Sequence, residues 1–196
     1  MLEQAPYDAV AAKWADARSK GGFREKSYVD RFLEYLPAGG CVLDLGCGSG
    51  VPIARYLLDH GYRVTGVDSS GEMLRLFRAN CPEAEAIRAD MVCGTFLRRI
   101  DGLIAWDSVF HIPKLEHAVL FRQMRLWVTP GAPVLLSAGG TEDEFTAPMF
   151  DVPFFYSGHA PEQTKALLRD AGFEILCAEI DDPSSRGHLA VLCRAS

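Results

Sequence analysis

Three glycines at alternate positions, directly after an apolar run that contains an acidic residue, constrain this chain more than any other feature. The segment reads Val42-Leu43-Asp44-Leu45-Gly46-Cys47-Gly48-Ser49-Gly50. Glycines let the backbone turn sharply and approach a ligand closely, because no Cβ stands in the way. A helix after such a turn offers free backbone N–H groups and the positive end of its dipole. The segment therefore predicts a strand, a loop and a helix that together bind a nucleotide-like cofactor.

The spacing of the glycines separates this loop from two other cofactor loops. The dinucleotide fingerprint G-x-G-x-x-G would need a glycine where Val51 stands, and Gly50 comes one residue early. A phosphate-binding loop would end in Gly-Lys-Ser or Gly-Lys-Thr, which this segment lacks. Residues at the ends of the other strands must therefore indicate which cofactor the loop serves.

Length and composition are those of one ordinary globular domain over residues 1–196. The chain is 48% hydrophobic and 23% charged, without repeats or low-complexity segments. Its net charge of −6 disfavours broad nucleic-acid binding, which uses a basic surface. No apolar run approaches the roughly 20 residues that cross a bilayer, and the first four residues lack a signal-peptide pattern. We expect a single domain with neither nucleic acid nor a membrane as partner.

The six cysteines are too scattered for a disulfide framework. They stand at positions 41, 47, 81, 93, 177 and 193, without a CxxC pair. No spacing of histidine, cysteine and carboxylate residues indicates a metal site. Cys47 is interpreted as a small residue that fills space between glycines, not as a nucleophile. We therefore expect reduced thiols, a cytoplasmic location and no bound metal.

Strand and helix patterns alternate along the whole chain. We expect strands at residues 41–45, 63–67, 84–89, 101–106, 133–137, 173–180 and 189–193. We expect helices at residues 3–20 and 24–36, from Pro52 to Gly61, after a cap at Ser69 or Ser70, at 113–128 and at 161–171. Strands that alternate with helices form parallel βαβ units, whereas the connection at 181–188 is too short for a crossover helix. The pattern predicts an α/β fold with a mostly parallel sheet of seven strands and an antiparallel strand at the end.

Acidic residues also follow the second and third expected strands. Asp68 stands 18 residues after Gly50, where a carboxylate can accept hydrogen bonds from both hydroxyls of a ribose. Asp90 and Met91 follow the third strand. The carboxyl ends of parallel strands lie along one edge of the sheet, so these residues should share one site with the glycine loop. The alternative is that Asp68 and Asp90 only cap helices or turns.

The glycine loop resembles motif I of the class I S-adenosylmethionine (SAM) dependent methyltransferases, whose pattern is (D/E)-x-G-x-G-x-G. Asp44, Gly46, Gly48 and Gly50 match all four fixed positions. The resemblance implies a Rossmann-like three-layer sandwich, SAM as the cofactor and S-adenosylhomocysteine as the product.

The resemblance also implies roles for individual residues. Asp68 would hold the ribose, Asp90 the adenine amino group, and Met91 would lie against the adenine ring. Asp107 would hold the cofactor's methionine amino group, or would simply lie on the loop surface. The cofactor-binding set that we predict comprises Tyr7, Trp14, Asp44, Gly46, Cys47, Gly48, Gly50, Asp68, Ser69, Met73, Asp90, Met91, Trp106 and Asp107.

The segment after the fourth strand, residues 106–113, is similar to the region where cofactor and acceptor meet in this superfamily. It reads Trp-Asp-Ser-Val-Phe-His-Ile-Pro. It departs from the (N/D/S)-P-P-(Y/F/W) pattern of enzymes that methylate nucleobase amino groups, and it has no Pro-Cys nucleophile. Nucleobase methylation is therefore disfavoured. His111 is the best-placed base for an acceptor that must lose a proton, although it could instead cap a helix or pack under the cofactor.

Residues 101–113 resemble a group of small bacterial methyltransferases that are taken to act on small molecules. The resemblance extends over most of the chain, including Tyr156 and Gly187-His188. It is specific for SAM and does not identify the acceptor. It implies in-line displacement of the methyl group by a positioned acceptor.

Two segments are expected to cover the site. The helical segment 1–36 carries Tyr7 and Trp14, which are seven residues apart and so share one helical face. The segment 138–160 holds five aromatic residues and is expected to form a lid over the acceptor. The alternatives are an ordinary apolar stripe for the first segment and a surface hairpin for the second. We expect Phe110, Tyr156 and His159 to line the acceptor pocket.

The sequence offers weaker evidence that the remaining basic residues and histidines belong to the site. Arg18, Lys20, Arg24 and Lys26 could meet an anionic group, but a solvated face explains most of them. His188 lies between the closing strands and could point to the same pocket. His60 and His117 lie within expected helices and are expected to face solvent.

We therefore predict a SAM-dependent methyltransferase, monomeric or homodimeric, that acts on a small-molecule acceptor. One alternative is a SAM-binding sensor or subunit without catalysis. The other is a nicotinamide-dependent oxidoreductase, against which Val51 in place of the third fingerprint glycine argues.

Overall fold

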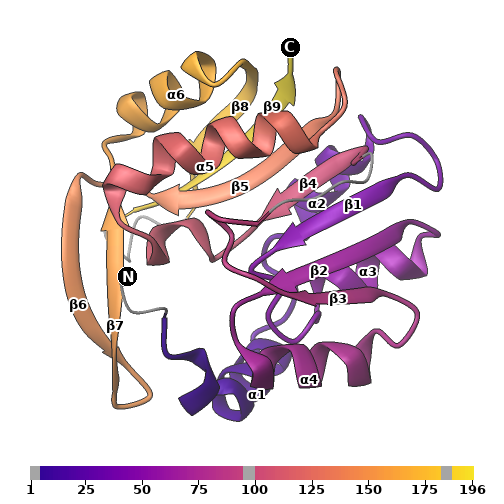
Figure 1. The fold of residues 1–196 in the computed structure, drawn as a ribbon, viewed down its shortest axis with the longest axis vertical. Helices are drawn as coiled ribbons and strands as arrows, with labels where there is room; N and C mark the ends of the chain where they lie inside the picture. Colours follow the sequence, from indigo (N-terminus) through magenta and orange to yellow (C-terminus); the bar gives the residue numbers. More distant parts are fainter. Residues whose placement is uncertain (1–4, 95–99, 182–186) are drawn as a thin grey trace.

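A twisted seven-stranded sheet forms the centre of the molecule in this computed structural model, which describes residues 5–94, 100–181 and 187–196. The strands are β1 (Cys41–Leu45), β2 (Arg63–Asp68), β3 (Glu85–Arg88), β4 (Gly102–Ala105), β5 (Pro133–Gly139), β8 (Phe173–Ile180) and β9 (His188–Ala195). Their order across the sheet is β3-β2-β1-β4-β5-β9-β8 (Figure 1). The pairs from β3 to β5 are parallel, and β9 runs antiparallel to both β5 and β8. The predicted sheet is confirmed, with its antiparallel strand one position inside the edge.

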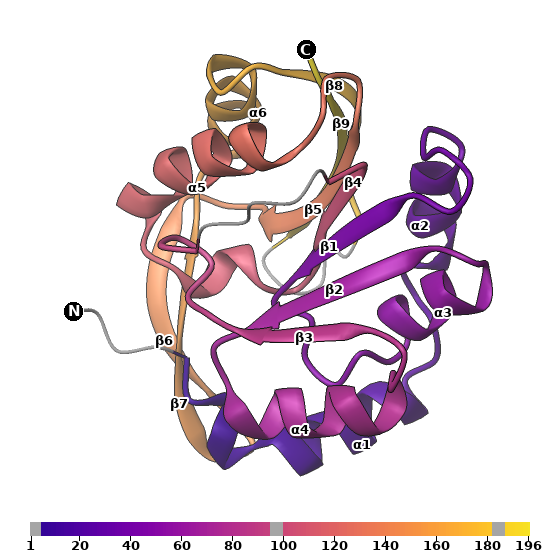
Figure 2. The same cartoon turned by 45° about the vertical axis from the view of Figure 1, so that its right-hand side comes forward.

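Helices cover both faces of the sheet, so the fold is the expected Rossmann-like three-layer sandwich (Figure 2). One face carries α2 (Lys26–Leu33), α3 (Ile53–Asp59) and α4 (Gly71–Asn80), and the other carries α5 (Lys114–Trp127) and α6 (Pro161–Asp170). Alternate residues of β1 point to opposite faces. Leu43 and Leu45 pack toward α5 and α6, whereas Val42 packs toward α2, α3 and α4. Two apolar clusters therefore fix the sheet between the two helical layers.

The amino-terminal segment differs from the expected long helix at 3–20. It forms a short 3₁₀ turn, η1 (Tyr7–Ala9), followed by α1 (Ala11–Lys20), and residues 3 and 4 lie outside the described residues. Pro6 restricts the residue before it and favours a break, which the apolar pattern did not reveal. The helix expected at 24–36 is shorter and ends at Leu33.

Short-range capping explains where α4 begins. The Ser70 hydroxyl accepts a hydrogen bond from the Met73 backbone N–H at 3.0 Å, so Ser70, and not Ser69, is the cap. None of the helices in the described part of the chain combines the length and apolar character that a membrane span requires.

Residues 143–158 form a separate two-stranded hairpin in the segment that was expected to be a lid. Its strands are β6 (Asp143–Met149) and β7 (Val152–Gly158), joined through Phe150 and Asp151, both of which have positive φ. The arrowheads of β1, β2 and β5 point toward this hairpin (Figure 1). The segment is therefore a two-stranded hairpin, and its role as a lid over the acceptor stays a prediction. Sequence pattern missed the turn, because Phe150-Asp151 lacks the glycine that usually marks it.

Two pairs of glycines bring backbone segments together at the end of the sheet, beside the hairpin. A Cβ at Gly139 would lie 2.8 Å from the Gly158 Cα, and one at Gly140 would lie 2.6 Å from the Gly187 carbonyl carbon. These backbones meet at distances that no larger residue permits. The first contact fixes the hairpin to the end of β5, and the second brings the segment after β5 against the start of β9.

We predict that Gly158→Ala destabilises the protein by about 1–3 kcal/mol, because the new Cβ would lie 2.6 Å from the Thr141 carbonyl oxygen. The free energy of unfolding in urea measures the effect. Gly71→Ala is the control, since its Cβ would meet only the Arg88 side chain at 3.5 Å. Equal stability of the two variants would contradict the close packing.

Candidate functional site

Two adjacent cavities lie at the carboxyl ends of the parallel strands. The smaller, of about 110 Å³, lies between the glycine loop, the ends of β2 and β3, and η1. The larger, of about 660 Å³, lies between the hairpin, α1 and the short turn η2 (Val109–His111). Five residues line both: Tyr7, Trp14, Trp106, Asp107 and His111. All five were predicted from sequence to belong to the site.

The glycine loop folds back over the end of β2. The N–H groups of Gly46 and Cys47 both donate to the Val67 carbonyl, at 2.8 and 3.0 Å. Gly46 and Gly48 have positive φ and line the smaller cavity. A Cβ at Gly46 would lie 2.3 Å from the Ser108 Cβ, so only glycine fits there.

Asp68 connects β2 to the glycine loop. Its carboxylate accepts hydrogen bonds from the N–H groups of Gly48 and Ser70, each at 2.9 Å, and it also lines the smaller cavity. Burial raises the pKa of Asp68, and these two hydrogen bonds oppose the rise. Asp90 likewise accepts from the Val92 N–H at 2.7 Å and lines the same cavity. Both carboxylates therefore cap backbone turns, as the alternative interpretation expected, and both also line the cavity, while their roles toward a ribose and an adenine stay predictions.

The other predicted cofactor residues divide between the cavity and the core. Ser69, Met73 and Met91 line the smaller cavity. The remaining three, Asp44, Cys47 and Gly50, lie outside the lining of both cavities.

Asp44 is a buried carboxyl group beneath the glycine loop. Burial, together with Asp68 and Glu25, raises the pKa of Asp44 to about 7. Its side chain is on the face of β1 that packs toward α2 and α3, since it alternates with Leu43 and Leu45. Cys47 is buried beside it, and burial raises the pKa of the Cys47 thiol well above its usual range.

Asp8, which sequence reasoning missed, fastens the amino-terminal segment over the smaller cavity. Its carboxylate accepts hydrogen bonds from the Ser70 hydroxyl and from the Glu72 N–H at the start of α4. The bond from Ser70, followed by that from Glu72, lowers the pKa of Asp8. Nothing in the sequence indicated this contact, because Asp8 lies more than 60 residues before the helix N-terminus that it caps.

His111 and Tyr7 form a hydrogen-bonded pair where the cavities join. The Nδ1 atom of His111 lies 2.9 Å from the Phe155 carbonyl oxygen, and its Nε2 atom lies 2.8 Å from the Tyr7 hydroxyl. A carbonyl can only accept, so Nδ1 carries the proton and Nε2 accepts from the tyrosine. Burial lowers the pKa of His111 and raises the pKa of Tyr7. The histidine is therefore a neutral base with its lone pair directed toward Tyr7.

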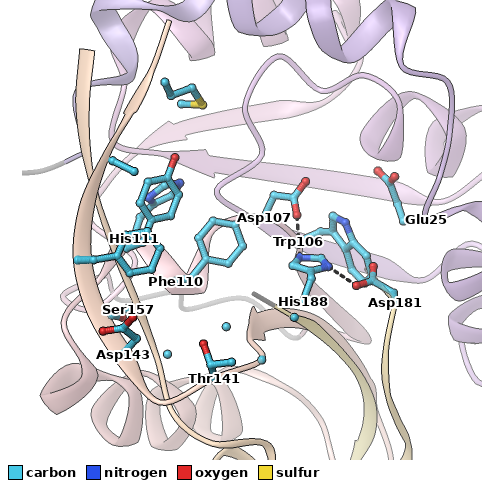
Figure 3. Close-up of a pocket in the computed structure, with 18 of the residues that line it drawn as sticks. Glu25, Trp106, Asp107, Phe110, His111, Thr141, Asp143, Ser157, Asp181 and His188 are labelled. Atoms are coloured by element: carbon cyan, nitrogen blue, oxygen red, sulfur yellow. Dashed lines mark hydrogen bonds and ion pairs between the residues drawn. The ribbon is translucent and has the colours of Figure 1, made fainter. Parts of the chain in front are cut away.

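The surroundings of His188 favour the protonated ring, in contrast to those of His111. Its Nε2 lies 3.0 Å from Asp107 and its Nδ1 lies 2.6 Å from Asp181 (Figure 3). A carboxylate only accepts, so Nδ1 donates its proton to Asp181, and Nε2 forms an ion pair with Asp107 when the ring is protonated. Burial alone would lower the pKa of His188, but the two carboxylates outweigh it and the pKa is raised. The two carboxylates thus favour the charged form of His188 in the wall of the larger cavity.

Asp107 is held by several partners. It adopts a φ of 53°, its N–H donates to the Ser137 hydroxyl at 2.8 Å, and Arg18 lies 3.9 Å from its second oxygen. Arg18 also pairs with Glu25, a carboxylate that is almost fully buried. The side chain of Asp107 is fixed by charge on both sides.

Only two of the three predicted acceptor residues line the larger cavity. Phe110 and Tyr156 line the larger cavity, but His159 lines neither. The Nε2 atom of His159 faces the Lys114 carbonyl at 3.3 Å, and its ring contacts His117. The expectation that His117 faces solvent was wrong, since it is fully buried and contacts Ser157 of the hairpin. Among the described residues, no group of three or more His, Cys, Asp or Glu side chains is arranged to hold a metal.

Comparison with known families gives a match over most of the chain. A family model described as a methyltransferase domain matches residues 22–178. Phosphoethanolamine N-methyltransferase 1 of Triticum aestivum is 31% identical over 173 residues, covering 82% of this chain and 33% of that protein. Trans-aconitate 2-methyltransferase of Azoarcus sp. (strain BH72) is 34% identical over 140 residues, covering 70% of this chain and 52% of that protein. The chain thus spans between a third and about half of the length of these two relatives.

Solved structures share the fold at lower identity. A SAM-dependent methyltransferase from Methanosarcina mazei superposes with a TM-score of 0.74 at 21% identity, covering 83% of this chain and 95% of that one. The 1,6-didemethyltoxoflavin-N1-methyltransferase of Burkholderia thailandensis superposes with a TM-score of 0.71 at 16% identity, covering 100% and 92%. The latter was solved with 1,6-didemethyltoxoflavin and S-adenosylhomocysteine bound.

We predict that Asp44→Asn stabilises the protein at alkaline pH. A folded pKa of about 7 means that the wild-type protein loses stability as pH rises from about 4 through 7, by roughly 4 kcal/mol at most. The amide cannot ionise, so the variant should not show this loss. Urea unfolding at pH 4.5 and pH 8 measures both proteins, with the exposed pair residue Asp16→Asn as control. A pH dependence unchanged by Asp44→Asn would contradict the buried, ionisable carboxyl group.

Proposed function

The chain belongs to the class I SAM-dependent methyltransferase superfamily, and we propose that it transfers a methyl group from SAM to a small-molecule acceptor by in-line displacement. One observation carries this proposal. A crevice lined by the glycine loop and two strand-end carboxylates shares five lining residues with a larger cavity, and one of these five is the buried His111. The first cavity suits a nucleoside and the second suits an acceptor.

The residues of the smaller cavity fit the adenosine part of SAM. Asp68 offers a carboxylate to the ribose hydroxyls, and Asp90 offers one to the adenine amino group. Met73 and Met91 provide apolar surface for the flat base. Gly46 and Gly48 leave the backbone open on the wall of the cavity, where a Cβ would intrude.

The methionine part of SAM would lie where the two cavities join. Asp107 lines both cavities, and its charge suits the cofactor's ammonium group. When bound, SAM supplies a methyl group that its sulfonium has already made electrophilic. The chain must then align an acceptor with that methyl group, and alignment alone contributes up to about 7–11 kcal/mol in the best intramolecular reactions.

Tyr7 and His111 provide a route for the proton of an acidic acceptor. The acceptor's O–H or N–H donates its proton to the Tyr7 oxygen, while the Tyr7 hydroxyl proton passes to Nε2 of His111, 2.8 Å away. Tyr7 ends the step neutral, and His111 ends it as an imidazolium whose Nδ1–H still donates to Phe155. Burial holds the pKa of His111 below its ordinary value, so the base is ready at neutral pH.

The named relatives support a small molecule as the acceptor. Their names give phosphoethanolamine, trans-aconitate and 1,6-didemethyltoxoflavin as acceptors, three molecules of different chemistry. This diversity supports the class of acceptor and does not identify it. A nucleic acid is not part of the proposal, because the larger cavity is closed on one side by the hairpin.

We predict that SAM and S-adenosylhomocysteine both bind, and that Asp68→Ala weakens binding by about 10- to 100-fold through loss of charged hydrogen bonds. Isothermal titration calorimetry measures the affinity, and thermal unfolding verifies that each variant folds. Asp90→Ala tests the same cavity without touching the glycine loop, and Asp59→Ala, on the exposed side of α3, is the control. Absence of heat with either nucleoside would contradict the proposed function, and binding without transfer to any acceptor would favour the non-catalytic alternative.

We predict that Tyr7→Phe raises the pKa of His111, because the neutral imidazole then loses the hydroxyl that donates to its Nε2. In the wild-type protein the pKa should lie below 6.5. Titration of the imidazole carbon-bound protons by NMR measures both values, with His111→Gln to assign the signal. An unchanged pKa in Tyr7→Phe would rule out the proton route through Tyr7.

A further inference from the structure

The larger cavity combines an aromatic wall with two cations, Arg18 and His188, that carboxylates already neutralise. We propose that the acceptor is a flat aromatic molecule, uncharged or singly charged, and not a polyanion. Its reactive O–H or N–H would lie at the Tyr7–His111 pair. This inference rests on the proposed function and names the substrate class of the same site.

Three aromatic rings form the wall. The ring of Tyr156 is stacked with Phe145 at 5.3 Å and an interplanar angle of 15°, and with Phe110 at 6.1 Å and 26°. Phe145 and Tyr156 are directly opposite each other in the hairpin, so the strand register fixes this contact. Ala147 and Met149 continue the same face of β6 and also line the cavity. A wall of this kind offers its area to another flat apolar surface.

The proposed base borders this wall. The His111 ring lies 4.8 Å from Phe110 and 5.0 Å from Tyr156, measured between ring centroids. Figure 3 shows Phe110 between His111 and the group formed by Asp107, His188 and Asp181. A ring that packs on the wall would therefore present its substituents to the Tyr7–His111 pair.

The charges of the cavity disfavour a polyanionic acceptor. Arg18 is paired with Glu25 and lies near Asp107, and both ring nitrogens of His188 face carboxylates. Among the described residues that line the cavity, three cationic side chains, Arg18, Arg24 and His188, stand against four carboxylates, Glu25, Asp107, Asp143 and Asp181. Arg24 is exposed and lies outside these ion pairs, so a tricarboxylate or a phosphate would meet one such cation together with four carboxylates.

The size of the cavity agrees with a ring system. Its volume of about 660 Å³ lies within the range of roughly 300–1,000 Å³ that encloses drug-sized ligands. The methionine part of the cofactor would take only the region of the shared residues. A small aliphatic amine would leave the aromatic wall exposed to water.

Binding to the complex with S-adenosylhomocysteine tests the proposal directly. Isothermal titration calorimetry would use phenols and hydroxyquinolines as aromatic probes, with citrate and phosphoethanolamine as anionic probes. We expect at least one aromatic probe to bind about tenfold more tightly than either anion. With radiolabelled SAM, the same probe should receive the methyl group.

Variants separate the aromatic wall from general effects on folding. Phe145→Leu keeps the site apolar but removes stacking, and should weaken aromatic binding by about 3- to 10-fold. Thr146→Ala is the matched control, since Thr146 is exposed on the other face of the same strand. It should leave the affinity unchanged.

Each outcome decides between the two proposals. Normal cofactor binding with tighter binding of citrate or phosphoethanolamine, or with no aromatic binding, would overturn the acceptor class alone. Equal aromatic affinity in Phe145→Leu and the wild-type protein would also overturn it. Absence of cofactor binding would contradict the proposed function, and the acceptor class would fall with it.

Discussion

The carboxylate of Asp68 is the contact on which the arrangement of the site depends. It joins the N–H of Gly48 in the glycine loop to the N–H of Ser70 at the start of α4, and so sets the distance between the ends of β1 and β2. Ser70 in turn donates to Asp8, which fastens the amino-terminal segment over the crevice. One buried charge thus determines the loop, a helix start and the cover of the smaller cavity.

Charge is concentrated in the buried part of the site, and the local surroundings of each group set its protonation state. Burial lowers the pKa of His111 and favours its neutral form, whereas Asp107 and Asp181 raise the pKa of His188 in the same cavity and favour its charged form. Such a division of acid and base character suits proton transfer beside a fixed electrostatic wall. Buried charge also lowers the stability of the fold as pH rises, since burial and acidic neighbours raise the pKa of Asp44 to about 7.

The features that could be predicted from the sequence are those that depend on local residue pattern. The glycine loop, Asp68 and Asp90 lie at strand ends in a fixed order along the chain, so periodicity and spacing sufficed to place them together. The contacts that join distant segments could not be predicted this way. The bond between Tyr7 and His111 spans 104 residues, and the bridge of Asp107, His188 and Asp181 depends on how β4, β8 and β9 are placed in the sheet. His117 is buried because that hairpin covers it, which its position in a helix does not reveal. The domain boundaries, the oligomeric state and the cytoplasmic location stay predictions.

A crystal structure of the protein with S-adenosylhomocysteine would test the central claim most directly. The account predicts both ribose hydroxyls within hydrogen-bonding distance of the Asp68 carboxylate, adenine beside Asp90 and Met91, and the sulfur where Tyr7, Asp107 and His111 meet. A nucleoside bound elsewhere, or an Asp68 carboxylate that makes no contact with the sugar, would contradict it.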